Sequence, residues 1–319
     1  MNTAPSFNTA PSFNAAPSSP RHAPDAPAER ALVLGGGGST GNAWLIGVIA
    51  GLSEAGLDVT DADLIVGTSA GSTAAAQITG ASSAELYAAV LAAPDHARPA
   101  TPQSESVRAA TGRVADQLER TAKIIAAAHD PEDMRRRMGA FALERDAGPD
   151  GAAHTRWRAV VAGRLPSQGW PDRRLLITAV DAVTGEPAVF DRDTGVELVD
   201  AVAASCSSGF AYAIGTSRYI DGGYRRNENA DLGAGYRRVL VLSPFGGRTR
   251  HPLEWRMQLA AQVDELRAGG SRVETVFPDS SAEHLFGANA MDHTLRPAAA
   301  RAGHSQGAAL AGRLAAFWR

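Results

Sequence analysis

The segment DLIVGTSAGSTAAAQI, residues 63–78, decides the fold of this chain of 319 residues. It opens with a short apolar run, residues 63–67, that is typical of a buried strand, and it continues into an alanine-rich stretch that favours a helix. Between them lies GTSAG, with Ser69 in the middle. A Gly-x-Ser-x-Gly turn between a strand and a helix presents its serine as a nucleophile, and Gly67 and Gly71 leave room for the chain to double back. The segment therefore predicts Ser69 as a candidate nucleophile.

A second strand, glycine-rich turn and helix stand just before the first. The run RALVLG ends at residue 35, GGGGSTG covers residues 35–41, and a helical pattern follows up to Gly56. Two such units in succession predict an α/β protein of three layers with a mainly parallel central sheet. Further strands are expected at residues 175–181, 187–191, 217–221, 238–244 and 273–277. The mostly helical residues 82–165 are expected either to cap a site or to pack on the sheet.

Composition excludes several classes of function. With 31 basic and 34 acidic residues the net charge is -3, so we expect no nucleic-acid partner. Residues 1–30 repeat NTAPSF and have little to bury, which predicts a disordered low-complexity tail without a secretory signal. The remainder, residues 31–319, is expected to form one domain. Because no run is apolar enough to span a bilayer, we expect a cytoplasmic protein, with peripheral membrane contact left open.

The Gly-x-Ser-x-Gly pattern occurs a second time, as GHSQG at residues 303–307. Its surroundings favour a helix on both sides, with no strand before it. In an α/β-hydrolase the acid and the histidine follow the serine, but after Gly307 there is no Asp, Glu or His. Ser305 is therefore predicted to be a surface residue of a terminal helix.

The glycine-rich turn has two interpretations. Gly36, Gly38 and Gly41 fit the G-x-G-x-x-G pattern of a dinucleotide-binding loop, which usually has an acidic residue at the end of the second strand. Here that strand ends in the serine turn instead. Successive glycine N–H groups at the start of a helix also form an oxyanion hole. Together with GTSAG the loop favours the oxyanion hole, and a nucleotide-binding protein stays the alternative.

The general base is sought at the ends of predicted strands. IDGG, residues 220–223, places Asp221 at such an end, where the active sites of open parallel sheets lie. The alternative is an Asp-Gly turn that only holds its own backbone. None of the eight histidines ends a predicted strand, and no pair has metal-ligand spacing, so no metal is expected. A Ser-Asp-His triad that uses His251, His284 or His293 stays open.

Together, GGGGSTG, GTSAGS and IDGG, in this order, resemble the motifs of the patatin-like phospholipases, over most of residues 31–244. The resemblance implies a patatin-like fold and a serine lipid acyl hydrolase that acts on a lipid or ester substrate. Such enzymes use a Ser-Asp dyad, without a catalytic histidine, metal or cofactor.

The same resemblance implies a role for each motif residue. Ser69 is the nucleophile between Gly67 and Gly71, and Asp221 is the base, followed by Gly222 and Gly223. The implied oxyanion hole is the loop Gly36, Gly37, Gly38, Ser39, Thr40 and Gly41. Thr40 stands where many members have a basic residue, so the hole is expected to consist of backbone donors and the helix dipole.

Overall fold

The computed structural model describes residues 29–92, 119–145 and 151–319. The predicted tail therefore lies almost entirely outside the described residues. Within these residues eight strands form one sheet in the order β5-β6-β3-β2-β1-β7-β8, with β4 paired to β3. The parallel strands are β1 (Arg30–Leu34), β2 (Leu64–Gly67), β3 (Arg174–Asp181), β7 (Arg238–Leu242) and β8 (Arg272–Val276). The antiparallel strands are β4 (Pro187–Phe190), β5 (Tyr212–Ile214) and β6 (Ser217–Asp221).

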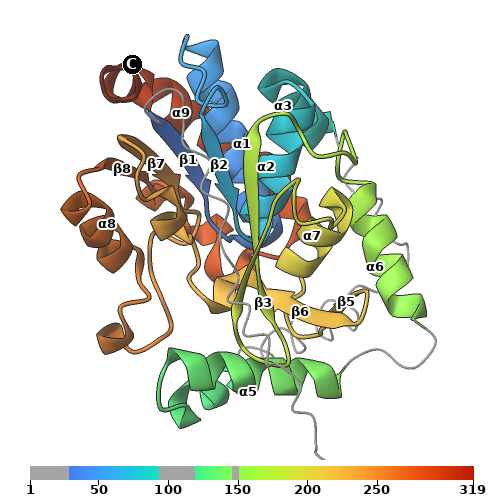
Figure 1. Cartoon of the computed structure of the whole chain (residues 1–319). Helices are drawn as coiled ribbons and strands as arrows, with labels where there is room; N and C mark the ends of the chain where they lie inside the picture. Colours follow the sequence, from blue (N-terminus) through green and yellow to red (C-terminus); the bar gives the residue numbers. More distant parts are fainter. Residues whose placement is uncertain (1–28, 93–118, 146–150) are drawn as a thin grey trace, which may run out of the picture.

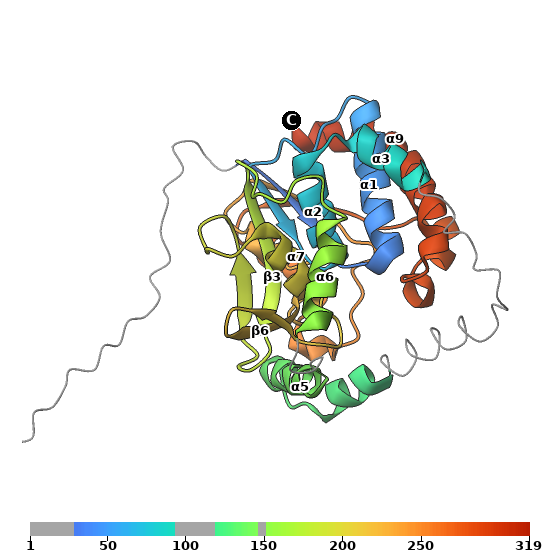
Figure 2. The same cartoon turned by 90° about the vertical axis from the view of Figure 1, so that its right-hand side faces the viewer.

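Helices flank the sheet on both sides, as the three-layer prediction requires (Figures 1 and 2). Leu32 and Leu34 of β1 belong to the larger core, with α1, α2, α7 and α9, whereas Ala31 and Val33 face α8. This alternation is what a strand covered on both faces requires. The helices are α1 (Gly38–Glu54), α2 (Ala70–Gly80), α3 (Ser83–Ala92), α5 (Pro131–Glu144), α6 (Ala152–Ala162), α7 (Leu198–Ser205), α8 (Leu259–Ala268) and α9 (Arg296–Trp318). The prediction of a mainly parallel α/β fold is confirmed.

The glycines of GHSQG serve helix packing. A Cβ on Gly303 would lie 2.4 Å from Trp44 O, and one on Gly307 would lie 2.2 Å from Val48 O, both on α1. The pattern thus lets α9 approach α1 closely. Ser305 lies on the exposed side of α9, in the middle of the helix.

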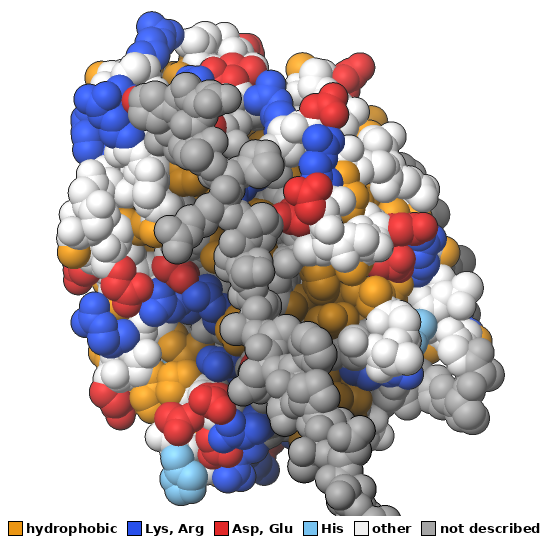
Figure 3. All heavy atoms as spheres, in the orientation of Figure 1, with side chains coloured by type: hydrophobic (Ala, Val, Ile, Leu, Met, Phe, Trp, Pro, Cys, Tyr) orange, Lys and Arg blue, Asp and Glu red, His pale blue; other side chains and the backbone are white. Residues whose placement is uncertain are grey.

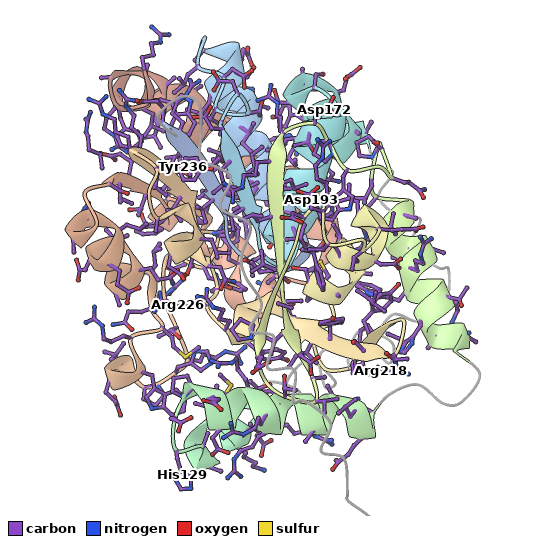
Figure 4. The ribbon with its side chains drawn as sticks, viewed as in Figure 1. His129, Asp172, Asp193, Arg218, Arg226 and Tyr236 are labelled. Carbon is purple, nitrogen blue, oxygen red and sulfur yellow. The ribbon has the colours of Figure 1, made fainter. Side chains whose placement is uncertain are left out.

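The strand β3 brings two distant segments together. Along one of its edges β2 pairs through Gly67 opposite Ile177, and β6 pairs through Asp221 opposite Ala179. The strand β4 pairs with residues 177–180 of β3, which overlap the β3 residues that pair with β2 and those that pair with β6. The strand β4 must therefore lie along the opposite edge of β3. The carboxyl ends of β2 and β6 therefore meet end to end on one edge of β3. Arg218, labelled in Figure 4, lies near the start of β6.

The helices within residues 82–165 pack in different places. The helix α5 lies across the end of the sheet where β1 and β2 finish (Figures 1 and 2), with Met134 and Met138 in one apolar cluster with Val180 and Ile220. The helix α6 instead packs on α7, where Trp157 Nε1 donates to Ala203 O. Residues 93–118 lie outside the described chain.

The face of the described chain drawn in Figure 3 carries charges of both signs. Arg226, for example, pairs with Asp231 and with Glu265 of α8. Within the described residues, no helix combines the length and the apolar character that crossing a membrane requires.

Candidate active site

Ser69 occupies a strained turn between β2 and α2. Its φ of 53° and ψ of -117° are rare for a residue with a Cβ, and such strain is typical of a nucleophile elbow. A Cβ on Gly67 would lie 2.6 Å from Ser72 Cα, and one on Gly71 would lie 1.9 Å from Leu34 O. Only glycine fits at either position, so the sequence pattern has a steric cause.

The structure brings Ser69 and Asp221 into contact. Ser69 Oγ donates a hydrogen bond of 2.8 Å to Asp221 Oδ2. The other carboxylate oxygen, Asp221 Oδ1, accepts from the N–H of Gly223 at 2.8 Å. The sequence placed Asp221 at the end of a strand in a parallel sheet, but β6 runs antiparallel to β3. The aspartate reaches the serine from the opposite direction, because β6 ends where β2 ends.

Burial makes Asp221 a stronger base than a free aspartate. Asp221 is only 8% exposed, and this desolvation raises the pKa of its carboxyl from 3.8 to about 6, against the opposing hydrogen bonds from Gly223 and Ser69. At neutral pH the group is mostly ionised. It can therefore accept a proton from Ser69.

The glycine-rich loop lies directly against the serine. A Cβ on Gly36 would lie 3.6 Å from Ser69 Cβ. The N–H of Gly36 donates to Asn227 O, that of Thr40 to Ala290 O, and that of Gly41 to Gly37 O. Within the described residues the N–H groups of the other three loop residues have no acceptor; these are Gly37, Gly38 and Ser39. Gly37 caps α1 and the other two residues begin it, so these N–H groups are the donors that remain for an anion.

A positive charge reaches this loop from the far end of the chain. Arg296, at the start of α9, donates from Nη1 to Ser39 O at 2.7 Å and from Nη2 to Asn42 Oδ1 at 3.1 Å. Arg296 was not predicted from the sequence, since nothing in a helical pattern indicates which earlier loop the helix will contact. Thr40 itself is fully buried.

Two small residues at the end of α7 support the elbow. The N–H of Ser69 donates to Ser205 Oγ at 2.9 Å, and Cys206 Sγ donates to Ser69 O at 3.1 Å. Burial raises the pKa of the Cys206 thiol, so this group stays protonated and is a poor nucleophile. Neither residue was predicted to have a role, although the two polar residues that end the apolar run AVAASC were a usable signal.

No histidine is a hydrogen-bonding partner of Ser69 or Asp221 in the described part of the chain. His251 Nδ1 pairs with Thr249 Oγ1, and burial lowers its pKa to about 4. His284 Nδ1 pairs with Ser281 O. His293 comes nearer, because its Nδ1 lies 2.9 Å from Ser39 Oγ at the glycine-rich loop. The described residues also contain no group of three or more His, Cys, Asp or Glu that is placed to hold a metal ion.

The pKa of Asp221 predicts an acidic limb in the pH profile. Because the proton acceptor must be ionised, kcat/KM for ester hydrolysis should fall tenfold per pH unit below about pH 6. The check is a profile of nitrophenyl ester hydrolysis between pH 4 and 9. His284→Gln and His293→Gln should keep the same limb, since neither ring contacts Asp221. A limb that disappears in either variant would assign the proton to histidine instead.

Comparison with known proteins adds a family to this geometry. A family model described as patatin-like phospholipase matches residues 32–233. No curated protein matches the chain by sequence.

Solved structures give weaker likenesses. VipD from Legionella pneumophila is 14% identical with a TM-score of 0.38, over 85% of this chain and 67% of that one. The type III effector ExoU is 16% identical with a TM-score of 0.34, over 88% of this chain and 54% of that one. Full-length ExoU from Pseudomonas aeruginosa, in complex with SpcU, is 20% identical with a TM-score of 0.34, over 88% and 52%. The chain thus spans about half the length of ExoU.

The family model covers well over half of the chain, from β1 through both Ser69 and Asp221. The glycine-rich loop, the elbow and the aspartate turn all lie inside the matched range. The chain therefore belongs to the patatin-like phospholipase family, which implies lipid acyl hydrolase activity.

Proposed function

We propose that the protein is a serine hydrolase that cleaves the acyl ester bonds of lipids, in the manner of a phospholipase A, lysophospholipase or esterase, with Ser69 and Asp221 as a catalytic dyad. One observation supports the dyad above all, the 2.8 Å hydrogen bond from Ser69 Oγ to Asp221 Oδ2. A nucleophile within hydrogen-bond reach of a base is the geometry that covalent catalysis requires.

Acylation begins with proton transfer. Asp221 takes the hydroxyl proton while Ser69 Oγ forms a bond to the ester carbonyl carbon. The carbonyl π electrons move to oxygen, and the free N–H groups at the start of α1 stabilise this anion together with the helix dipole. When the intermediate collapses, the C–O bond to the alcohol breaks. The departing oxygen takes the proton from Asp221, and the acyl group stays on Ser69.

Deacylation repeats these steps with water. Asp221 removes a proton from a water molecule, the resulting hydroxide attacks the acyl carbon, and a second oxyanion forms in the same hole. Its collapse breaks the bond to Ser69 Oγ, which regains the proton from Asp221, and the carboxylic acid leaves. These proton transfers use one group in both directions, so the mechanism needs neither a metal nor a cofactor.

Two observations support a lipid or ester rather than a nucleotide as the substrate. The chain belongs to a phospholipase family, and the end of β2 lacks the acidic residue that a dinucleotide-binding fold usually has there. A lipid or ester substrate suits the acyl chemistry, and an enzyme that meets its substrate in a bilayer requires peripheral membrane contact. A cytoplasmic location belongs to the same proposal.

Hydrolysis of a lipid panel tests this function. The purified protein is incubated with diacyl phospholipids, lysophospholipids and neutral acylglycerols, and the products are identified by mass spectrometry. Release of free fatty acid from any class, lost in the Ser69→Ala variant, supports the proposal. Turnover that the Ser69→Ala variant retains, or none with any class, contradicts it.

The oxyanion loop gives a separate prediction. Gly38 has a φ of +65°, and a Cβ there would lie 2.7 Å from Ala290 O, so Gly38→Ala must move the loop. We expect kcat to fall about 10²–10³-fold, as when one oxyanion donor is lost. The matched control is Gly56→Ala, which also has a positive φ, +83°, but has nothing within 4 Å of the added Cβ.

Steady-state kinetics and thermal melting of the two variants separate strain from chemistry. Both should lose some stability, because a left-handed alanine costs about 1–2 kcal/mol. Only Gly38→Ala should lose turnover. Equal losses of kcat in the two variants would mean that backbone strain alone lowers turnover. If calorimetry instead detects nucleotide binding and the protein has no esterase activity, the loop is a dinucleotide-binding loop.

A further inference from the structure

The loop that follows the aspartate turn contains a buried amide that the mechanism above does not use. Asn229 is fully buried, has a φ of 53° and precedes the short 3-10 helix η2 (Ala230–Gly233). Arg226, labelled in Figure 4, lies in the same loop. Asn229 Nδ2 lies within hydrogen-bond distance of four oxygens: Thr68 Oγ1 at 3.0 Å, Thr178 Oγ1 at 3.2 Å, Gly222 O at 3.2 Å and Arg226 O at 2.7 Å.

The orientation of this amide is fixed from its other side. Asn229 Oδ1 accepts from Arg225 Nη1 at 2.7 Å, and the same nitrogen donates to Asp231 Oδ1 at 3.0 Å. Two of the atoms around Nδ2 are carbonyl oxygens, which only accept. A flipped amide would therefore set oxygen against oxygen and face the guanidinium with a donor.

Two of the acceptors adjoin the reacting residues. Thr68 directly precedes Ser69, and Gly222 directly follows Asp221. Thr68 Oγ1 also lies 2.9 Å from Thr178 Oγ1, on the strand that both segments share. One nitrogen atom thus contacts the elbow, the aspartate turn and the strand between them. Because all these groups are buried, water does not replace a bond that is lost.

We propose that Asn229 is a positioning residue, whose carboxamide holds the serine elbow and the aspartate turn at the separation that proton transfer between Ser69 and Asp221 requires. The inference rests on the proposed function, since it assigns Asn229 a role in the reaction of that dyad. Asn229 is fully buried and is not expected to touch substrate.

Loss of this contact has two kinetic consequences. A misplacement of about 1 Å between reacting groups costs on the order of 10²-fold in rate, so kcat should fall while KM stays unchanged. The hydrogen bond from Ser69 also lowers the pKa of Asp221. If that bond lengthens, the acidic limb of the pH profile should move upward, by about one pH unit.

Other titratable groups surround these residues. Burial raises the pKa of Cys206 and of Tyr224, whose ordinary values already lie above 8, so neither moves toward the acidic limb. Arg225 and Asp231 form an ion pair. Glu228 is the other buried carboxyl with a raised pKa, and its Oε1 accepts from Ser243 Oγ at 2.7 Å. The pH profile of ester hydrolysis is therefore also measured for Glu228→Gln. This variant should keep the acidic limb that is assigned to Asp221.

The experiment compares two variants that break the contact from opposite ends. Asn229→Gly removes the amide and tolerates the positive φ. Thr68→Val keeps the volume and removes one acceptor, and Thr68→Ser should restore it. The control is Gln306→Met. Gln306 is a buried amide of α9 that bonds to Trp44, Phe277 and Asp279 and to no residue of the site.

The measurements are kcat, KM and the pH profile of ester hydrolysis, the rate of fluorophosphonate labelling of Ser69, and the melting temperature. We expect kcat about 10² lower and an upward shift of the limb in Asn229→Gly, a change in the same direction in Thr68→Val, and rescue in Thr68→Ser. Gln306→Met should lower the melting temperature and leave kcat, KM, the pH profile and the labelling rate unchanged.

Wild-type kcat and an unmoved limb in Asn229→Gly, with a lower melting temperature, would reduce Asn229 to a structural residue and overturn the inference. Failure of the proposed function would look different. In that case the wild type would hydrolyse no lipid, whereas the labelling rate of Ser69 and its pH dependence would still report on the position of Asp221.

Discussion

Replacing Ser69 by alanine will abolish ester hydrolysis and fluorophosphonate labelling. Removal of the nucleophile from a well-studied serine protease lowers kcat about 10⁶-fold, and the proposed mechanism leaves no second group to form the acyl-enzyme. Ser205 and Cys206 adjoin Ser69, but the first is fully buried and the second is a protonated thiol. The measurement is nitrophenyl ester turnover, with labelling followed by intact-protein mass spectrometry.

Ser305→Ala is the matched control for this prediction. Ser305 has the same Gly-x-Ser-x-Gly surroundings but lies exposed on α9, where the two glycines only let the helices approach. Both activity and labelling should stay at the wild-type level. Labelling that survives in Ser69→Ala and disappears in Ser305→Ala would reverse the assignment.

Replacing Asp221 by asparagine has the second largest expected effect. The side chain keeps its shape but loses its basicity, so kcat should fall by at least about 10⁴-fold, the upper end of what general acid–base catalysis contributes. His251→Gln and His284→Gln should cost little. His293→Gln should lower kcat by well under ~10²-fold, the lower end of what general acid–base catalysis contributes, because its ring contacts Ser39 and not the dyad. Ester turnover of the four variants is compared at pH 8.

Stability separates loss of the base from loss of the fold. The folded pKa of Asp221, about 6, lies above the unfolded value of 3.8, so ionisation disfavours the folded state. This pKa difference lowers the free energy of unfolding by about 3 kcal/mol. The destabilisation is fully present above about pH 6 and absent below pH 3.8. Asp221→Asn should therefore be at least as stable as the wild type at pH 8. Near-normal turnover in this variant, or collapse in one histidine variant, would contradict the dyad.

Local patterns predicted the elements because each depends on neighbouring residues. The run before Ser69 and the glycines around it are required by a strand that turns sharply into a helix, and this requirement is visible within nine residues. The strands expected at residues 175–181 and 187–191 formed as β3 and β4 for the same reason. The short strand β5 was not predicted, since its three residues show no periodicity of their own.

Contacts between distant segments were beyond the sequence. Arg296 reaches Ser39 across 257 positions, and Asn229 reaches Thr68 across 161, so neither partner is marked by any local pattern. Asp221 was placed by an argument about parallel strands that its own strand does not obey. Asp221 nevertheless lies beside Ser69, because the carboxyl ends of two opposed strands meet, and only the register of β3 reveals this.

That meeting of strand ends has a consequence for folding. The two residues joined by the Ser69–Asp221 bond are 152 positions apart, so the loop between them must close before they touch. Contacts of such long range form late and slowly, whereas local helical structure forms within about a microsecond. During refolding from denaturant, helical circular dichroism should therefore recover before enzymatic activity does. We therefore expect recovery of ester hydrolysis to follow the pairing of these strands rather than the initial collapse of the chain.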